Sequence, residues 1–550
     1  MTAPRLPHTA PAGGKVRPGM RLSNFLVLVC LVFLALGSSG GSAFEAIARA
    51  EEGALPALPE FLASPPALPP GYDEQAAWRL DLSEALKIAM QQNLGIMVNR
   101  KALRSADLAV ESATAGMYEP TVSAGVTHTR ADQPGTASSG GLPSVGTTSS
   151  GNNWTLSLNQ GLPTGALLSL GLTASDGSSL VGEQGTRSTG VSFSVSQPIL
   201  RGFSRDLVIP RYAILTAQIG SARERHQFEI SAATLIRDTE TAYWGVVSTL
   251  YSYNVQVQAQ KLTEDTVALV RRQIAAGMAS ASDLTGAENT FAQHKLTVLQ
   301  GEAAVEQSWD TLRGILNLPR DQWTRPILPT DRPHLAPAEP PSPEQALEAA
   351  LQHRPEVALL GLDLKSSELA LRRAKNDALP KIDLGVSGSV TGSGDSYGGA
   401  LRDLSGHTTR DFSVMATLSW TPLGRANRVN RELARIEHDV TVTNREIRVQ
   451  EIWNEVRAAV RRQRNAALQV TAARNALILA NQTLEIEDRK YVAGTSSNLA
   501  IAQLQNGLAS AEVAELQALL ENESAQAALL LATGQLLEQR HIQLEVAKQP

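Results

Sequence analysis

The stretch VSFSVSQPIL, residues 191–200, does more than any other to decide the fold of this chain. Apolar residues alternate with serine over six positions, and the chain then leaves through Gln-Pro into a sequence with helical periodicity. A second stretch, FSVMATLSWTPLG at residues 412–424, has the same alternation and also leaves through a proline. Alternation with period two is typical of a strand with one apolar and one polar face. The two stretches therefore predict equivalent strands in two copies of one unit.

The sequence around these stretches repeats as well. Each copy predicts a helix, strands, a long helix, a turn and a further helix, which indicates a duplicated α+β unit in one pseudo-symmetric body. The first repeat covers residues 81–318, with its first helix from about Leu82 to Met117, strands within 119–200, a long helix over 204–276 and a helix over 281–317. The second covers 344–535, with helices, strands within 381–420, a long helix over 425–493 and a helix over 497–533.

Six segments carry the strand alternation, and their wet faces are Ser, Thr and Gly with almost no charge. Each has ~9–11 residues, the length of a tilted strand that crosses an outer membrane. A soluble sandwich is the alternative, but its wet face would normally carry Lys and Glu. Residues 131–151, 175–189 and 391–410 are predicted as long outer loops, and 161–165 as a tight turn. The segments begin near Val122, Trp154, Leu168, Val191, Ile382 and Phe412.

The long helical stretches are expected to pack side by side as a tube. Apolar residues recur at spacings of 3 and 4 from Val456 to Leu484, and seams after both turns are rich in Ala, Gly and Ser, which lets helix axes approach closely. Stretches of ~70 residues would be ~105 Å long, too long for a compact globular domain. An ordinary two-stranded coiled coil is the alternative, with a seam richer in Leu, Ile and Val.

The N-terminus predicts export. Basic residues precede a 12-residue apolar run from Phe25 to Leu36, and small residues follow to Ala43. Because a membrane-spanning helix needs ~20 residues, we interpret 1–43 as a cleaved signal peptide rather than an anchor, with Ala50 as a fallback cleavage site. Residues 44–80 form a Pro-rich lead-in, 319–343 a Pro-rich linker and 536–550 a C-terminal tail. The only cysteine, Cys30, lies in the signal, so packing alone must hold the rest.

Composition excludes several classes of function. The net charge is −5, and no basic stripe with interleaved aromatics indicates nucleic-acid binding. No HExxH, GxSxG, P-loop or CxxC motif occurs, and the nine histidines have no metal-ligand spacing, so we expect no enzyme, cofactor or metal. His294 lies on a seam and is interpreted as a packed core residue.

Six strands are too few to enclose water, because even an eight-stranded barrel is filled by its own side chains. Several chains must therefore share one barrel. A trimer would have 18 strands if all six cross, or 12 if the hairpin 154–175 stays outside the wall. The sequence leaves both counts open.

With these features in place, the chain over about residues 80–537 resembles the TolC-like outer membrane efflux proteins. The resemblance rests on the duplicated plan, the starts Ser83-Glu84-Ala85-Leu86 and Gln345-Ala346-Leu347, the exit Gln197-Pro198-Ile199-Leu200, and the two Gly-x-x-Ser turns at Gly277 and Gly494. It implies a homotrimeric outer-membrane β-barrel continuous with a long periplasmic α-helical barrel. It also implies passive export of substrate delivered by a periplasmic adaptor (membrane fusion protein) and an inner-membrane transporter.

The resemblance also assigns candidate sites. The turns would be periplasmic tips that meet the adaptor; pure turn chemistry is the alternative, since these residues can also end and cap helices. Family members with an acidic constriction carry acids after the second turn, where Ala500 and Gln503 stand here. We therefore interpret the three acids before Gly494 as a solvated helix face, with an acidic gate as the alternative. The candidates are Gly277, Ser280, Asp283, Gly494 and Ser497 at the tips, and Glu485, Glu487, Asp488 and Gln503 in a gate region.

Aromatic residues at the ends of the strands, Tyr118, Trp154, Phe412 and Trp420, are predicted to anchor the barrel at the membrane interfaces, with simple packing as the alternative. A periplasmic coiled-coil scaffold without a pore is the rival to the channel. The cargo stays open between drugs, metals, other small molecules and proteins.

Overall fold

The structure, a computed structural model, describes residues 66–133, 147–179, 183–334, 339–406, 409–493 and 495–544. The predicted signal peptide, most of the Pro-rich lead-in and Gly494 lie outside the described residues. The described residues all belong to one compact unit, Ser64–Pro550.

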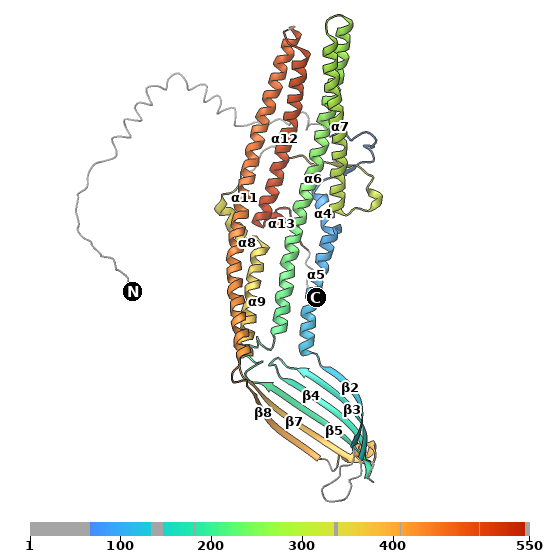
Figure 1. The fold of residues 1–550 in the computed structure, drawn as a ribbon, viewed down its shortest axis with the longest axis vertical. Coiled ribbons are helices and arrows are strands. Elements are labelled where there is room, and N and C mark those ends of the chain that lie inside the picture. Colours follow the sequence, from blue (N-terminus) through green and yellow to red (C-terminus); the bar gives the residue numbers. More distant parts are fainter. Residues whose placement is uncertain are drawn as a thin grey trace, which may run out of the picture. The chain divides into compact units, whose positions relative to one another are not determined.

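Two long helices run through the fold. They are α6 (Tyr212–Ala275) and α11 (Arg425–Val492), and each turns back into a shorter partner, α7 (Ala281–Leu316) and α12 (Asn498–Thr533). Helices α6 and α12 also pack together, so the two hairpins form a wall in the order α7–α6–α12–α11 (Figure 1). The predicted seam of α11 is buried at Val456, Gln463 and Val470, and Gln463 Nε2 donates to Asn522 Oδ1 of α12 at 3.1 Å.

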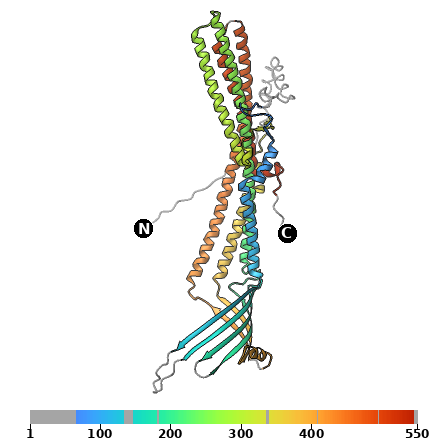
Figure 2. The same cartoon turned by 90° about the vertical axis from the view of Figure 1, so that its right-hand side faces the viewer.

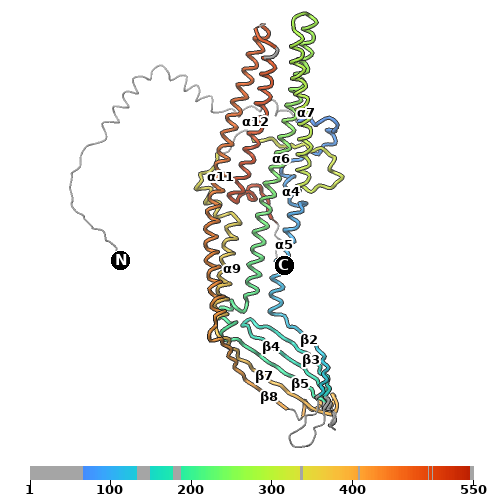
Figure 3. The backbone as a smooth tube through the Cα atoms, viewed as in Figure 1, coloured from blue at the N-terminus to red at the C-terminus, as the bar shows by residue number. Residues whose placement is uncertain are grey.

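Nearer the strands, other helices replace α7 and α12 in the wall. These are α4 (Leu82–Gln92) and α5 (Leu94–Tyr118) from the first repeat, and α8 (Pro343–His353) and α9 (Pro355–Asp377) from the second. Helix α6 packs on α5 and α9, and α9 packs on α11, so the order here is α5–α6–α9–α11. Figure 3 follows α6 and α11 unbroken from the strands to their turns. The wall is thus four helices wide at both levels.

Two helix predictions of the first repeat need correction. The expected helix from Leu82 to Met117 is two helices, because Asn93 Oδ1 accepts hydrogen bonds from Gly95 N and Ile96 N and starts a new helix. The second repeat breaks in the same place, where Pro355 begins α9. Helix α6 begins at Tyr212 rather than 204, because turns over 201–211 include Leu207 at φ +56° and precede the helix.

One antiparallel sheet holds all six predicted strands. They are β2 (Thr121–Gln133), β3 (Thr147–Gly161), β4 (Leu167–Ser179), β5 (Glu183–Pro198), β7 (Lys381–Gly394) and β8 (Thr409–Ser419), in the spatial order β2-β3-β4-β5-β7-β8. The hairpin of β3 and β4 is therefore inside the sheet, hydrogen-bonded to β2 and β5 (Figure 2).

The loops are shorter than predicted. Pairing continues past the last apolar residues, so β2 reaches Gln133 and β4 reaches Ser179, because backbone hydrogen bonds can extend a ladder of polar residues beyond the membrane-type alternation. In the expected loop 391–410, β7 continues to Gly394 and a short helix, α10 (Tyr397–Asp403), follows.

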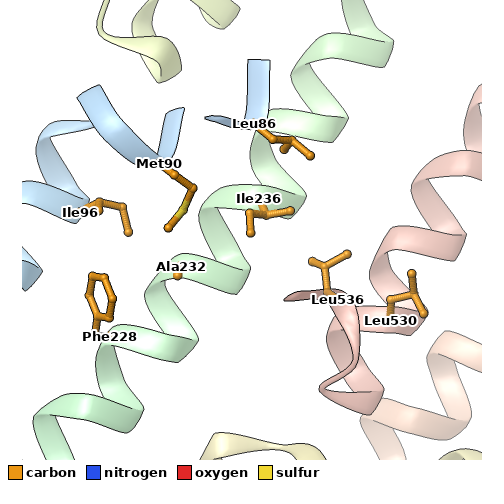
Figure 4. Packing of buried hydrophobic residues seen from close by; sticks show 8 residues of the cluster. All are labelled: Leu86, Met90, Ile96, Phe228, Ala232, Ile236, Leu530 and Leu536. Carbon is orange, nitrogen blue, oxygen red and sulfur yellow. The ribbon is translucent and has the colours of Figure 1, made fainter. Parts of the chain in front are cut away.

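The lead-in and linker are also more ordered than predicted. Residues Trp78–Leu80 form β1, which pairs in parallel with β6 (Ile327–Pro329), and a 3-10 turn, η1, covers Arg320–Gln322. The predicted tail begins with helix α13 (Leu536–Gln539). Leu536 joins Leu86, Ile236 and Leu530 in a core cluster that ties the tail to α4, α6 and α12 (Figure 4). Distant hydrophobic contacts, invisible to local sequence pattern, order these segments.

Among the described helices, none combines the length and the apolar content needed to cross a membrane.

Candidate functional site

The first hairpin tip is a helix end closed by glycine. Gly277 has φ +72°, its N–H donates to Ile274 O at 2.9 Å, and Met278 N donates to Gln273 O at 2.8 Å. This is the Schellman arrangement, which needs a left-handed residue that glycine adopts without strain. A Cβ at Gly277 would meet nothing within 4 Å, so backbone conformation rather than space selects glycine.

Helix α7 starts from a capping box. Ser280 Oγ accepts a hydrogen bond from Asp283 N at 3.3 Å, and Asp283 Oδ2 accepts from Ser280 N at 2.9 Å. The hydrogen bond from the Ser280 backbone, helped by that from its hydroxyl, lowers the pKa of Asp283. Turn chemistry alone therefore accounts for these two side chains, and adaptor contact remains a prediction.

The second tip is built from hydroxyl residues. Thr495 N donates to Lys490 O at 2.9 Å, and Ser496 Oγ donates to Glu487 Oε1 at 2.6 Å. Ser497 caps α12 by accepting from Ala500 N at 3.2 Å. The tip is therefore held by Glu487, a residue assigned from sequence to the gate region.

A hydrogen bond joins the two tips. Gln273 Nε2, on α6, donates to the Tyr491 hydroxyl, on α11, at 3.0 Å. One level further from the tips, His294 Nε2 of α7 lies 2.6 Å from Asn506 Oδ1 of α12. His294 is therefore a half-buried residue that connects the two hairpins. A groove of about 530 Å³ between the tips is lined by Val270, Met278, Tyr491 and Ser496, among others.

Sequence reasoning missed Gln273 and Tyr491. Each lies within one turn of a tip glycine, and that shared position was the available signal. Their pairing spans 218 residues, so no local pattern could have matched them to each other.

The candidate gate residues do not converge. Glu485 pairs with Arg489 along α11, and Glu487 accepts from Lys490 Nζ at 2.9 Å. The hydrogen bonds from Ser496 and Lys490 lower the pKa of Glu487. Asp488 and Gln503 are exposed. Within one copy of the chain these groups form local pairs on a helix surface rather than an acidic cluster.

The sheet has two chemically different faces. On one, polar side chains, nearly all of them hydroxyls, line up across all six strands, as in the row Thr121, Asn159, Ser169, Ser194, Ser387 and Ser413. Hydroxyl pairs at 2.7 Å link neighbouring strands, for example Ser123 with Ser157 and Ser387 with Ser413. A hollow of about 420 Å³ lies on this face.

The opposite face is apolar and exposed. One register row runs Val122, Leu158, Leu170, Phe193, Gly388 and Phe412. Val126, Phe412 and Val414 are each 69–71% exposed, which would be unfavourable in water. The arrangement suits hydrocarbon on one side of the sheet and water on the other.

Two candidate interfacial aromatics, Tyr118 and Trp420, lie beside strand ends, whereas Phe412 is the fourth residue of β8 and Trp154 stands in the middle of β3. Tyr118 ends α5, one turn before β2, and Trp420 follows β8 and is 62% exposed. Trp154 packs edge-to-face on Tyr397 of α10, with ring centroids 5.4 Å apart. Tyr397 was missed because it lies in a stretch predicted as loop.

The described residues hold no group of three or more His, Cys, Asp or Glu side chains placed to bind a metal ion. These residues form a sheet with one apolar and one polar face, a wall of helices and two helical hairpin tips. Such features suit the passage of solutes across a membrane and the docking of a partner protein at the tips.

Comparisons with known proteins agree on one family. Residues 346–535 match the family model described as outer membrane efflux protein. The chain is 25% identical over 364 residues to the probable efflux pump outer membrane protein TtgC of Pseudomonas putida, an alignment that covers 65% of this chain and 71% of the relative.

Solved structures share the fold over most of the chain. The CmeC outer membrane channel of Campylobacter jejuni superposes with a TM-score of 0.61 at 15% identity, covering 83% of this chain and 86% of the channel. The open state of the MtrE outer membrane channel of Neisseria gonorrhoeae gives 0.59 at 19% identity, covering 84% and 91%.

Proposed function

Because this chain belongs to the TolC-like outer membrane efflux protein family, we propose that it forms the passive exit duct of a tripartite export system. The protein resides in the outer membrane, with a large helical part in the periplasm. A periplasmic adaptor and an inner-membrane pump deliver the cargo, and the duct itself carries out no chemistry.

The two-faced sheet carries this proposal. A strand layer with exposed Val, Leu and Phe on one side and Ser, Thr and Gly on the other has no use in a soluble scaffold, because its apolar face would be unprotected. In an outer membrane the same face contacts lipid and the hydroxyl face contacts water.

The sheet is not closed within one copy. In the described part of the chain, strands β2 and β8 are its edges, and each pairs with a single neighbour. An open edge inside hydrocarbon leaves backbone groups without hydrogen bonds, at a cost of several kcal/mol per group. Pairing β8 of one copy with β2 of the next removes both edges.

The two outermost helices of the wall nearest the sheet, α5 and α11, lie on the same sides as the edge strands β2 and β8. Helix α5 leads into β2 and α11 follows β8, so the side that carries the β8 edge also carries α11. Helix α11 presents an unpartnered stripe there with the 4,3,4,7 spacing of a coiled-coil seam. Its members, 43–57% exposed, are Val429, Leu433, Ile436, Val440 and Ile447.

A second copy fits this stripe. Helix α5, at the opposite side of the wall, exposes Leu94, Val98 and Leu108 to 45–63%. Contact between α11 of one copy and α5 of the next would be head-to-tail, and such contacts form a ring when the rotation between copies closes. The family resemblance gives the number of copies as three.

At the other end of the duct, the tips are the docking surface for the adaptor. The groove between them has a mixed lining of Thr, Ser, Gln and Asp side chains with several alanines, Val270 and Met278, and Met278 is 74% exposed. Gly277, Ser280, Asp283 and Ser497 shape this surface, with Gly494 at the equivalent place in the second repeat.

The test starts from outer membranes. Unheated gels should give an oligomer that dissociates on boiling, and cross-linking from residues beside Gly277 should recover an adaptor together with its pump. A monomer in the soluble periplasmic fraction would instead support the pore-free scaffold and end the proposal. The identity of the recovered pump would name the cargo.

A further inference from the structure

The short helix α10, between β7 and β8, lies on the apolar face of the sheet. Val386 and Val390 point to that face along β7, and Gly392 and Gly394 continue the same alternation. A Cβ at Gly392 would overlap Ala400 O, and one at Gly394 would lie 2.8 Å from Ala400 N. The two glycines therefore let the backbone of α10 rest directly on the apolar side of the strand rather than on its hydroxyl side.

The apolar face changes character at the level of α10. One register row of that face is still mostly apolar and consists of Val126, Trp154, Ala174, Thr189 and Gly392. The next row toward the far ends of the strands, here called the polar row, consists of His128, Asn152, Asp176, Arg187 and Gly394. Because α10 rests on one glycine of each row, it lies across the border between them.

The distance to the opposite border fits the thickness of a membrane. On the apolar face of β5, Val191, Phe193 and Val195 stand between Arg187 at one end and Gln197 at the other, ten residues further along the strand. At about 3.4 Å per residue and a tilt of about 40°, ten residues cover about 26 Å of depth. The apolar band of an outer-membrane barrel is about 25 Å tall. If Gln197 marks the periplasmic border, then Arg187 and α10 mark the outer one.

Helix α10 also covers the polar row. The Tyr397 hydroxyl donates to Asp176 Oδ2 at 3.1 Å. Arg187 Nη1 donates to Asp395 O at 2.5 Å, and its guanidinium carbon lies 5.5 Å from the centre of the Tyr397 ring. The edge of that ring packs against Trp154, and Tyr and Trp are favoured where an apolar surface meets a wet one. In water these polar groups would need no cover, whereas beside hydrocarbon they do.

We propose that α10 is an interfacial helix that contacts outer-leaflet lipid at the outer border of the membrane. This inference rests on the proposed exit duct. Ala400 is fully buried, whereas Leu401 is 57% exposed and continues the apolar face, so Leu401 lies among the headgroup ends of the acyl chains. The next residue, Arg402, is exposed, and its long side chain can carry its charge to the lipid phosphates.

Depth-dependent quenching in lipid vesicles tests the position of α10. Full-length Leu401→Cys, Phe193→Cys and Ser405→Cys proteins are labelled with a fluorophore, and Cys30 belongs to the predicted signal peptide. Bromines at the headgroup end of the acyl chains should quench the label at 401 most strongly, and bromines deep in the bilayer should quench the label at 193. The label at 405, an exposed position beyond α10, should respond to iodide in the water.

The outcomes separate this inference from the duct. A label at 401 that responds only to iodide, together with lipid quenching at 193, would overturn the inference and leave the duct standing. A label at 193 that no lipid bromine quenches would defeat the duct and this inference together.

A pair of glycine variants tests the seat of the helix. Gly392→Ala places a Cβ against Ala400 O and should lift α10, so quenching of the label at 401 by the lipid bromines should fall and quenching by iodide should rise. Gly398→Ala is the matched control on α10, because a Cβ there meets nothing within 4 Å. Equal quenching in the two variants would contradict the seat on β7. If Gly392→Ala does not accumulate, the quenching profile of the three labels decides.

Discussion

Shortening two side chains of the α11 stripe should dissociate the oligomer. Leu433 and Ile436 are 57% and 52% exposed in one copy, and both would be covered by α5 of a neighbour. Full burial of a Leu or Ile side chain contributes about 1.5–3 kcal/mol, so covering the exposed half contributes about 1 kcal/mol for each.

The lost burial energy counts once for every contact between copies in the ring. Leu433→Ala with Ile436→Ala costs about 2 kcal/mol at each contact between copies, and three such contacts cost about 6 kcal/mol. At 1.4 kcal/mol per tenfold change, the assembly constant should fall about 10⁴-fold.

The assay is the mass of particles in detergent over a dilution series, with the dissociation temperature on unheated gels as a check. Leu401→Ala is the matched control, because Leu401 has the same exposed fraction, 57%, but lies on α10, away from the stripe. The reasoning is refuted if the double variant dissociates at the same protein concentration as the wild type. It is also refuted if Leu401→Ala weakens the oligomer as much as the double substitution does.

Three further perturbations have defined outcomes. Arg540 Nε and Nη2 hold the buried Glu240 carboxylate at 2.6 and 3.0 Å, so Arg540→Met should cost about 3 kcal/mol of unfolding free energy at pH 8. Burial raises the pKa of Glu240 above its usual 4.5, so this loss should shrink as the pH falls toward 4.5, where Glu240 takes up a proton; a pH-independent loss by chemical denaturation would contradict this. Gly277→Ala should speed hydrogen exchange at the first tip, whereas Gly286→Ala, which also has open space around its Cβ but no positive φ, should slow exchange in α7; equal effects would remove the left-handed requirement. Tyr491→Phe removes the hydrogen bond to Gln273, worth about 1 kcal/mol, and should broaden the distance between spin labels on the two tips; an unchanged distribution would show that the bond does not hold them together.

Local periodicity accounts for the parts of the fold that sequence could predict. The alternation in VSFSVSQPIL and its counterparts fixes six strands and their two faces, because a one-residue shift would move every apolar side chain to the other face. The seam through Val456 and Val470 likewise fixes which face of α11 is buried.

Contacts between distant segments explain what sequence could not predict. The break at Asn93 depends on an amide that both caps α5 and donates to Ile315 O, 222 residues away. The pairing of β1 with β6 joins two Pro-rich stretches that have no strand pattern of their own. The place of the hairpin β3–β4 in the sheet depends on which strands pair along their edges. The period-two alternation within each strand is the same whichever strand lies beside it, so it cannot predict the strand order.

Conductance of the purified full-length protein in planar lipid bilayers tests the central claim, that several copies enclose water between their hydroxyl-lined strands. Discrete, long-lived current steps from the oligomeric fraction are predicted. Protein that inserts without carrying current, or that never leaves the aqueous phase, would contradict the account.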